Sequence, residues 1–229
     1  MHPTRLDTAI LLFSRSAAED SLAKPLSAAK HGQSKAIALQ LIRRARSVAK
    51  HAGLPVFFIS ENLQHGLSFG ERFADAFEQL FARGFERVIS IGNDCPTLNS
   101  FDLQAAAQKL ETHSAVIGPA SDGGAYLIGL HRNAFNAATF AALNRQTERT
   151  LADLKAYVVA GYYCLPEKSD LDSVADLQAQ LQSIFFPKLL KIRLLNILTP
   201  TFSDWLTPSI FVPIAARFST IVLRGPPTF

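Results

Sequence analysis

At 229 residues the chain is long enough for one α/β domain, alone or with an appendage, and its 48% of hydrophobic residues exclude a disordered chain. Residues 1–182 carry equal numbers of basic and acidic side chains, which argues against a nucleic-acid-binding face, whereas residues 183–229 carry five basic and one acidic. Two cysteines in no metal-type spacing, and no signal-peptide pattern, favour a reduced, cytoplasmic protein.

The first half of the chain alternates short apolar runs with helical patterns. We expect strands at residues 8–14, 55–60 and 87–92, and helices at residues 34–51, 70–83 and 100–111. The clearest helix is the second, in which apolar side chains recur at helical spacing: Phe73, Ala76, Phe77, Leu80 and Phe81. Ser100 is the expected N-cap of the third helix. A polar loop is expected between the first strand and about Gly32.

The second half of the chain continues this alternation. We expect strands at residues 115–118, 125–130 and 158–165, and helices at residues 134–143, 147–157 and 172–181, the last capped by Asp172 or Ser173. Strands that alternate with helices of this length predict right-handed crossovers and a mostly parallel sheet with helices on both faces. The predicted fold class is therefore α/β, with residues 1–182 as the folded domain.

Residues 183–229 form an apolar, basic tail that six prolines interrupt. Its prolines and polar residues argue against a membrane-spanning helix, although only Asp204 is charged between Leu194 and Ala216. Basic side chains among Leu and Ile, near the only tryptophan, Trp205, suit peripheral contact with a membrane surface. The alternatives are packing on the body or on a partner subunit, and disorder.

Two apolar runs stop abruptly in turns that carry an aspartate, at Asp94 and at Asp122. In a parallel α/β sheet, the residues just past the carboxyl ends of the strands line the ligand crevice, so both side chains are expected there. A second acidic pair, Asp170 and Asp172, also follows a predicted strand. Because Mg²⁺ or Mn²⁺ takes oxygen ligands, Asp94 and Asp172 are candidate metal ligands.

Each of these aspartates has a structural alternative. Asp94 stands shortly before a proline and could simply organise an Asx-turn, and Asp172 could be a helix N-cap. Asp122, Gly123 and Gly124 could form a hairpin turn. Their functional interpretation is that the bare backbone lets a ligand approach closely, while Asp122 holds a sugar or acceptor hydroxyl.

Gly70, Glu71 and Arg72 open the clearest helix. Glu71 could compensate the helix dipole beside a solvated Arg72, or Arg72 and the helix N-terminus could face a phosphate. The six histidines show no metal-ligand spacing. No Walker loop or Gly-x-Gly-x-x-Gly occurs, which removes support for P-loop and dinucleotide-binding functions.

Four stretches, in this order and spacing, resemble a family of predicted GT-A, or nucleotide-diphospho-sugar transferase, glycosyltransferases, formerly a domain of unknown function. The family includes arsenosugar-biosynthesis-type glycosyltransferases. The stretches are residues 69–73 (Phe-Gly-Glu-Arg-Phe), 91–96 (Ile-Gly-Asn-Asp-Cys-Pro), 118–130 and 170–177. The resemblance spans about residues 8–181 and implies a Rossmann-like GT-A fold, a nucleotide-linked donor and a divalent metal at Asp94.

Two segments depart from the pattern of this family. Its first strand is usually followed by a Gly-x-x-Lys-Thr-Arg loop that meets the nucleotide phosphates. Here residues 14–26 lack the glycine and the Thr-Arg pair, and Lys24 stands as the counterpart of the lysine. The family's Trp-Ser-Thr segment reads Arg145-Gln146-Thr147.

The resemblance favours a metal-dependent glycosyltransferase that moves a sugar from a nucleotide-sugar donor to a small-molecule or lipid acceptor. Taken with the residue patterns above, it leads us to expect Mg²⁺ or Mn²⁺ on Asp94 and Asp172, and catalytic roles for Asp94 and Asp122. The remaining candidates are expected to bind substrate: Arg15, Lys24, Arg72, Gly123 and Gly124. One alternative is a nucleotidyltransferase that releases pyrophosphate, against which the altered first loop counts. Another is a non-catalytic GT-A-like binding protein with the tail as its docking element.

Overall fold

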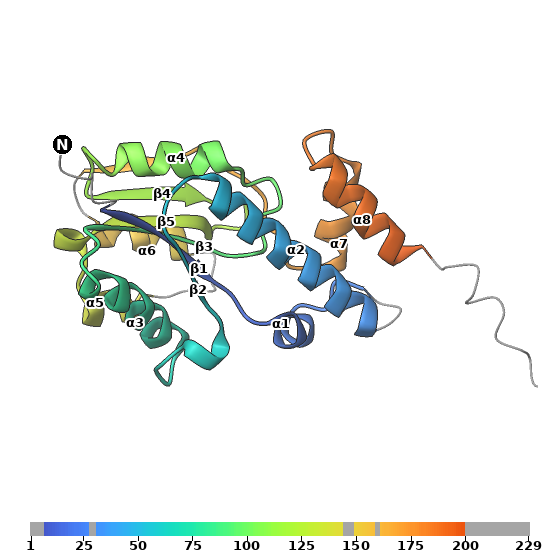
Figure 1. Cartoon of the computed structure of the whole chain (residues 1–229), viewed down its shortest axis with the longest axis horizontal. Helices are drawn as coiled ribbons and strands as arrows, with labels where there is room; N and C mark the ends of the chain where they lie inside the picture. Colours follow the sequence, from blue (N-terminus) through green and yellow to red (C-terminus); the bar gives the residue numbers. More distant parts are fainter. Residues whose placement is uncertain (1–6, 28–30, 144–148, 159–160, 200–229) are drawn as a thin grey trace, which may run out of the picture. The chain divides into compact units, whose positions relative to one another are not determined.

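The computed structural model describes residues 7–27, 31–143, 149–158 and 161–199 (Figure 1). The chain divides into a compact unit that ends at Leu198 and a second unit from Thr199 onward. The fold described below is that of the first unit. The Arg145-Gln146-Thr147 segment and most of the apolar tail, Trp205 included, lie outside the described residues.

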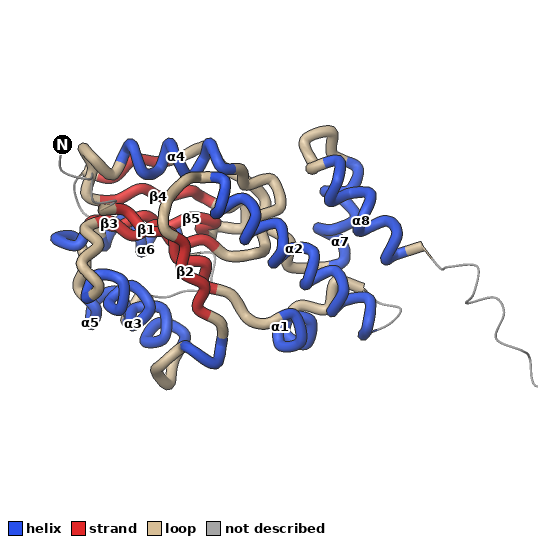
Figure 2. Tube along the Cα trace, viewed as in Figure 1, coloured by secondary structure: helices blue, strands red, loops and turns tan. Residues whose placement is uncertain are grey.

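A six-stranded mixed sheet forms the centre of this unit, in the order β2-β1-β3-β5-β4-β6 (Figure 2). The strands are β1 (Thr8–Phe13), β2 (Val56–Ile59), β3 (Arg87–Ile91), β4 (Ala115–Pro119), β5 (Ala125–His131) and β6 (Tyr162–Cys164). Strand β5 runs antiparallel to β3 and β4, whereas the other neighbouring pairs are parallel. The predicted α/β fold with a mostly parallel sheet is confirmed.

Helices cover both faces of the sheet. They are α1 (Ala17–Ala23), α2 (His31–His51), α3 (Phe69–Ala82), α4 (Ser100–Lys109), α5 (Ala137–Ala141), α6 (Thr150–Tyr157), α7 (Val174–Gln182) and α8 (Lys188–Leu198). Two short 3-10 helices occupy Glu61–Leu63 and Arg132–Ala134. Successive side chains of β1 point to opposite faces. Ala9 and Leu11 therefore join the core beneath α3, α5 and α6, while Ile10 and Leu12 join the core beneath α2 and α4.

Helix α3 shows why the predicted aromatic stripe matters. Phe73, Phe77 and Phe81 lie on one face, and their rings pack against Phe135 and Phe140, with the Phe77 and Phe140 centroids 5.2 Å apart. Aromatic pairs at such distances stabilise a core beyond the area that they bury. The helix begins with a capping box at its N-cap serine, which fixes the end that faces the cleft described below.

Several local predictions were wrong. The expected polar loop after β1 contains helix α1, whose N-cap is Ser16. The N-cap of α4 is Asn99 and not Ser100, because the Asn99 side chain accepts from two backbone amides of the first turn. Of the two predicted N-caps of α7, Ser173 is confirmed, and Asp172 does not cap the helix.

Helix α8 extends the compact unit beyond the predicted boundary at residue 182. Its Leu190 and Leu194 are buried in a third core cluster with side chains of α2 and α7. Gln33 of α2 also donates a hydrogen bond from Nε2 to the carbonyl of Ile197, at 3.0 Å. Across the described ranges, every helix is too short or too polar to span a bilayer.

Candidate functional site

A cleft of about 720 Å³ opens where β1 and β3 end and β4 turns into β5. It is the crevice that the sequence predicts at the carboxyl ends of parallel strands. Most of the predicted site residues line it: Arg15, Lys24, Arg72, Asp94, Asp122, Gly124 and Asp172. Gly123 lies in the same turn as Gly124 but does not line the cleft.

Asp94 is held at the floor of the cleft by its own backbone and by a neighbouring glycine. The amide of Leu171 donates to the carbonyl of Asp94 at 2.8 Å, which joins the loop at residues 170–172 to the end of β3. A Cβ on Gly92 would lie 2.6 Å from Asp94 Oδ1. A glycine at position 92 therefore leaves room for the Asp94 carboxylate to fold back over the strand end.

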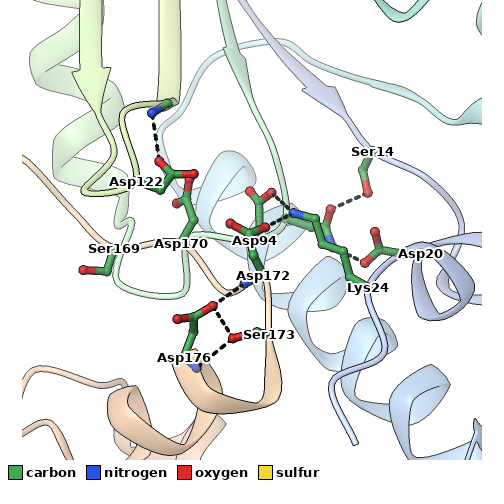
Figure 3. A network of polar contacts seen from close by, with 12 residues as sticks. Ser14, Asp20, Lys24, Asp94, Asp122, Ser169, Asp170, Asp172, Ser173 and Asp176 are labelled. Carbon is green, nitrogen blue, oxygen red and sulfur yellow. Dashed lines mark hydrogen bonds and ion pairs between the residues drawn. The ribbon is translucent and has the colours of Figure 1, made fainter. Parts of the chain in front are cut away.

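Lys24 connects the two predicted metal ligands. Its Nζ lies 2.8 Å from Asp94 Oδ2 and 2.5 Å from Asp172 Oδ1, and Figure 3 shows the lysine reaching between the two carboxylates. Burial by itself lowers the pKa of Lys24, but the two carboxylates more than offset this and hold the pKa above its ordinary value. The ammonium is thus fixed in its charged form at the point where both carboxylates meet.

Asp170 is a further carboxylate of the cleft that the sequence did not single out as a ligand. Its Oδ1 is buried and has no hydrogen-bond partner within the described part of the chain. Burial raises the pKa of Asp170 to about 8, and the negative charges of Asp94, Asp122 and Asp172 add to this rise while Lys24 opposes it. The cleft therefore holds a buried acidic group whose Oδ1 is unsatisfied among the described residues, and Figure 3 shows this group beside Asp122.

A buried polar relay behind Lys24 was also missed. Ser14 Oγ donates to Asn93 Oδ1 at 2.8 Å, and Asn93 Nδ2 donates to Asp20 Oδ2 at 2.9 Å. Burial raises the pKa of Asp20, against the opposing hydrogen bond from Asn93. The relay fastens α1, and with it Lys24, to the ends of β1 and β3. The Ser16-x-x-Glu19 pattern, typical of a helix N-terminus, was the available signal for α1.

The turn that carries Asp122 is a hairpin turn, as one of the two interpretations predicted. Strands β4 and β5 pair antiparallel on either side of it, and the amide of Gly124 donates to Asp122 Oδ1 at 2.8 Å. Gly123 has a φ of 88°, which favours glycine. Asp122 also lines the cleft, and its negative charge acts on Asp170. The side chain therefore shapes the turn and is also exposed to the cleft.

Arg15 and Arg72 bring positive charge to the cleft from two other elements. Arg15 follows β1, and Arg72 lies in the first turn of α3, where its Nη1 donates to the carbonyl of Leu67 at 3.1 Å. Glu71 accepts hydrogen bonds from the amides of Ser68 and Leu67, which lower its pKa, so this side chain completes the capping box.

The cleft walls carry five carboxylates (Asp20, Asp94, Asp122, Asp170 and Asp172) and three cationic side chains (Arg15, Lys24 and Arg72). Among the described residues, no three or more His, Cys, Asp or Glu side chains are arranged to hold a metal ion in this conformation. The Lys24 ammonium occupies the meeting point of Asp94 and Asp172 instead.

Comparisons with known proteins match the sequence of this chain to a family and its structure to a known fold. The sequence profile described as "Uncharacterized protein conserved in bacteria (DUF2064)" matches residues 28–145. None of the curated proteins matches the chain. A provisionally assigned nucleotide-diphospho-sugar transferase from Desulfovibrio desulfuricans G20 superposes with a TM-score of 0.71 at 20% identity, covering 84% of this chain and 95% of that one. This likeness shows a GT-A-like fold.

Two mycobacterial structures are more distant. The Rv0371c homologue of Mycobacterium sp. strain JC1 has a TM-score of 0.49 at 10% identity, over 84% of this chain and 99% of that one. Rv0371c from Mycobacterium tuberculosis H37Rv, solved in complex with manganese, has a TM-score of 0.43 at 13% identity, over 77% and 99%. Likenesses this weak say nothing about the chemistry of the present chain.

Proposed function

The chain belongs to the bacterial family of uncharacterized proteins DUF2064, and we propose that it is a metal-dependent glycosyltransferase. It would move a sugar from a nucleotide-diphospho-sugar to a small-molecule or lipid acceptor. The observation that carries the proposal is that Asp94 and Asp172 both contact the Lys24 ammonium, close to the buried Asp170, at the carboxyl edge of a GT-A-like sheet.

The donor atoms of the cleft fit Mg²⁺ or Mn²⁺. Asp94, Asp170 and Asp172 offer carboxylate oxygens alone, which hard divalent cations prefer, and the orphaned Oδ1 of Asp170 needs a cationic or hydrogen-bonding partner. Asp94 and Asp172 would hold the ion in place of the Lys24 ammonium. A bound divalent cation supplies positive charge against a departing diphosphate.

Three side chains are suited to the phosphates of the donor. Once released from Asp94 and Asp172, Lys24 can donate to a phosphate oxygen, and the forked guanidinium of Arg15 or Arg72 can bind one through two hydrogen bonds. The N-terminus of α3, next to Arg72, adds the partial positive charge of the helix dipole. These groups would hold the diphosphate and leave the sugar pointing toward the Asp122 turn.

The Asp122 turn would receive the sugar and the acceptor. Gly124, which lines the cleft at this turn, leaves the backbone bare there, so that a ring can approach closely. Asp122 would orient the acceptor hydroxyl, whose oxygen attacks the anomeric carbon while the bond to the diphosphate breaks. A carboxylate in this position can accept the hydroxyl proton.

The test is binding by the full chain, measured by thermal shift and calorimetry with Mn²⁺ alone and with a panel of nucleoside-diphosphate sugars. We expect Mn²⁺-dependent binding that Asp94→Ala weakens at least about tenfold, because even indirect partners of a metal ion contribute that much. Asp75→Ala, an equal change on α3 away from the cleft, should bind as the wild type does.

Other outcomes would redirect the proposal. Unchanged binding in a folded Asp94→Ala variant would remove Asp94 from the site. Pyrophosphate release from a nucleoside triphosphate would identify a nucleotidyltransferase instead. A well-folded protein that binds nothing on the panel would favour a non-catalytic GT-A-like domain.

A further inference from the structure

Helix α8 and the turn before it are apolar on two opposite sides. One side contributes Leu190 and Leu194, 5% and 0% exposed, to the core shared with α2 and α7. The other side is open to solvent. We call its large apolar side chains, with their exposed fractions, the outer face: Ile184 (88%), Phe185 (81%), Leu189 (62%) and Ile192 (57%).

The charged side chains of the segment that carries the outer face are all positive. Lys188, Lys191 and Arg193 lie on the same helix, and the chain has no acidic residue between Asp176 and Asp204. Residues 1–182, by contrast, carry equal numbers of acidic and basic side chains. The segment that carries the exposed apolar surface, residues 183–198, therefore holds three positive charges and no negative one.

This combination selects among the surfaces that could cover the outer face. Exposure of these apolar side chains to water is unfavourable, because transfer of apolar surface from water to an apolar phase releases free energy. A second copy joined by two-fold symmetry would bring the same patch, and thus the same cations, against each other. An anionic bilayer surface offers both an apolar phase for the side chains and negative headgroups for the cations.

We propose that the outer face of α8 docks on an anionic membrane surface. Phe185, Leu189 and Ile192 enter the interfacial region, while Lys188 and Arg193, both exposed at its margin, contact the lipid phosphates. Helix α8 lies along the surface with its buried side still packed on the body. The inference does not depend on the glycosyltransferase proposal, because none of these residues lines the cleft.

The test is co-sedimentation of the full chain with vesicles of phosphatidylcholine alone and with vesicles that also contain phosphatidylglycerol. We expect binding to the anionic vesicles, weakened by salt. Because each surface cation strengthens such binding roughly fivefold, Lys188→Gln combined with Arg193→Gln should weaken it on the order of 25-fold. Arg43→Gln combined with Lys50→Gln, which removes two exposed cations of α2, is the matched control and should change binding little.

Ile192→Gln tests the apolar contribution and should also reduce sedimentation with anionic vesicles. Equal binding by the wild type and both α8 variants, each shown to be folded by circular dichroism, would overturn the proposal. So would failure of the wild type to sediment with anionic vesicles. A dimer in analytical ultracentrifugation that Ile192→Gln dissociates, without vesicle binding, would assign the outer face to a second copy of the chain.

Discussion

Lys24 shows that the candidate site depends on contacts between residues that are far apart in the sequence. The sequence marks Lys24 as a candidate for substrate binding, whereas in the structure its ammonium joins Asp94, seventy positions away, to Asp172. Its pKa is held above the ordinary value by these two partners, so it stays charged. In the proposed metal site, the same ammonium would compete with a divalent cation for the two carboxylates.

Replacing Lys24 tests this competition directly. Lys24→Met should tighten Mn²⁺ binding about tenfold or more, because hydrogen bonds to charged groups are worth about 1.5–3 kcal/mol and the metal would no longer have to break them. Lys24→Arg keeps the positive charge and should bind Mn²⁺ nearly as the wild type does. Calorimetric titration of the full chain measures both. Unchanged or weaker Mn²⁺ binding in Lys24→Met would show that the ammonium does not oppose the metal.

At the scale of elements, the contact between α3 and α5 sets the position of α3, whose first turn lines the cleft. The capping box at the start of α3 and its phenylalanine stripe are local features, but the depth of its docking depends on Gly70. A Cβ at Gly70 would lie 2.0 Å from the carbonyl oxygen of Ala141, in the last turn of α5. The two helices can approach this closely only because residue 70 has no side chain.

Gly70→Ala should therefore destabilise the protein by about 1–3 kcal/mol, the usual cost of overpacking a close contact. The free energy of unfolding in urea measures the effect. Gly32→Ala is the matched control: Gly32 lies in α2, and a Cβ there would meet nothing within 4 Å. That substitution should be neutral or stabilise by up to ~1 kcal/mol. Equal stabilities for the two variants would show that α5 yields freely to the added methyl group.

At the scale of the whole molecule, α8 makes the compact unit longer than the predicted domain. Leu190 and Leu194 close a core against α2 and α7, and α7 follows the loop that carries Asp170 and Asp172. The same cluster includes Leu171, which lies between Asp170 and Asp172, so its packing helps to position this loop of the cleft. The division of the chain at residue 182 cuts through that cluster.

Leu194→Ala tests whether α8 belongs to the cooperative fold. Deletion of a fully buried leucine side chain should cost about 2–5 kcal/mol, seen as a shift of the single unfolding transition. Leu189→Ala makes the same chemical change at a position that is 62% exposed, and it should cost less than about 1 kcal/mol. Were α8 an independent appendage, Leu194→Ala would leave the main transition unchanged.

The order and type of most elements could be predicted because their signals are local. Apolar runs between Gly, Asn and Pro gave the strands, and the period of the phenylalanines gave α3. Helix α1 was missed because its seven residues are too few for a periodic pattern, although Ser16 and Glu19 marked its start. The cap of α4 was placed one residue late because Asn99 and Ser100 are both good N-cap residues.

The sequence by itself determined the α/β fold and the strand ends that carry Asp94 and Asp122, because neighbouring residues dictate strand, helix and turn. Only the tertiary structure decided which charges meet: that Asp172 contacts Lys24 instead of capping α7, and that the buried Asp170 Oδ1 has no hydrogen-bond partner among the described residues. Such pairings arise from the crossing of chain segments far apart in sequence, and burial then sets their protonation. Local sequence patterns therefore predict neither the pairing of distant charges nor the effect of burial on their protonation.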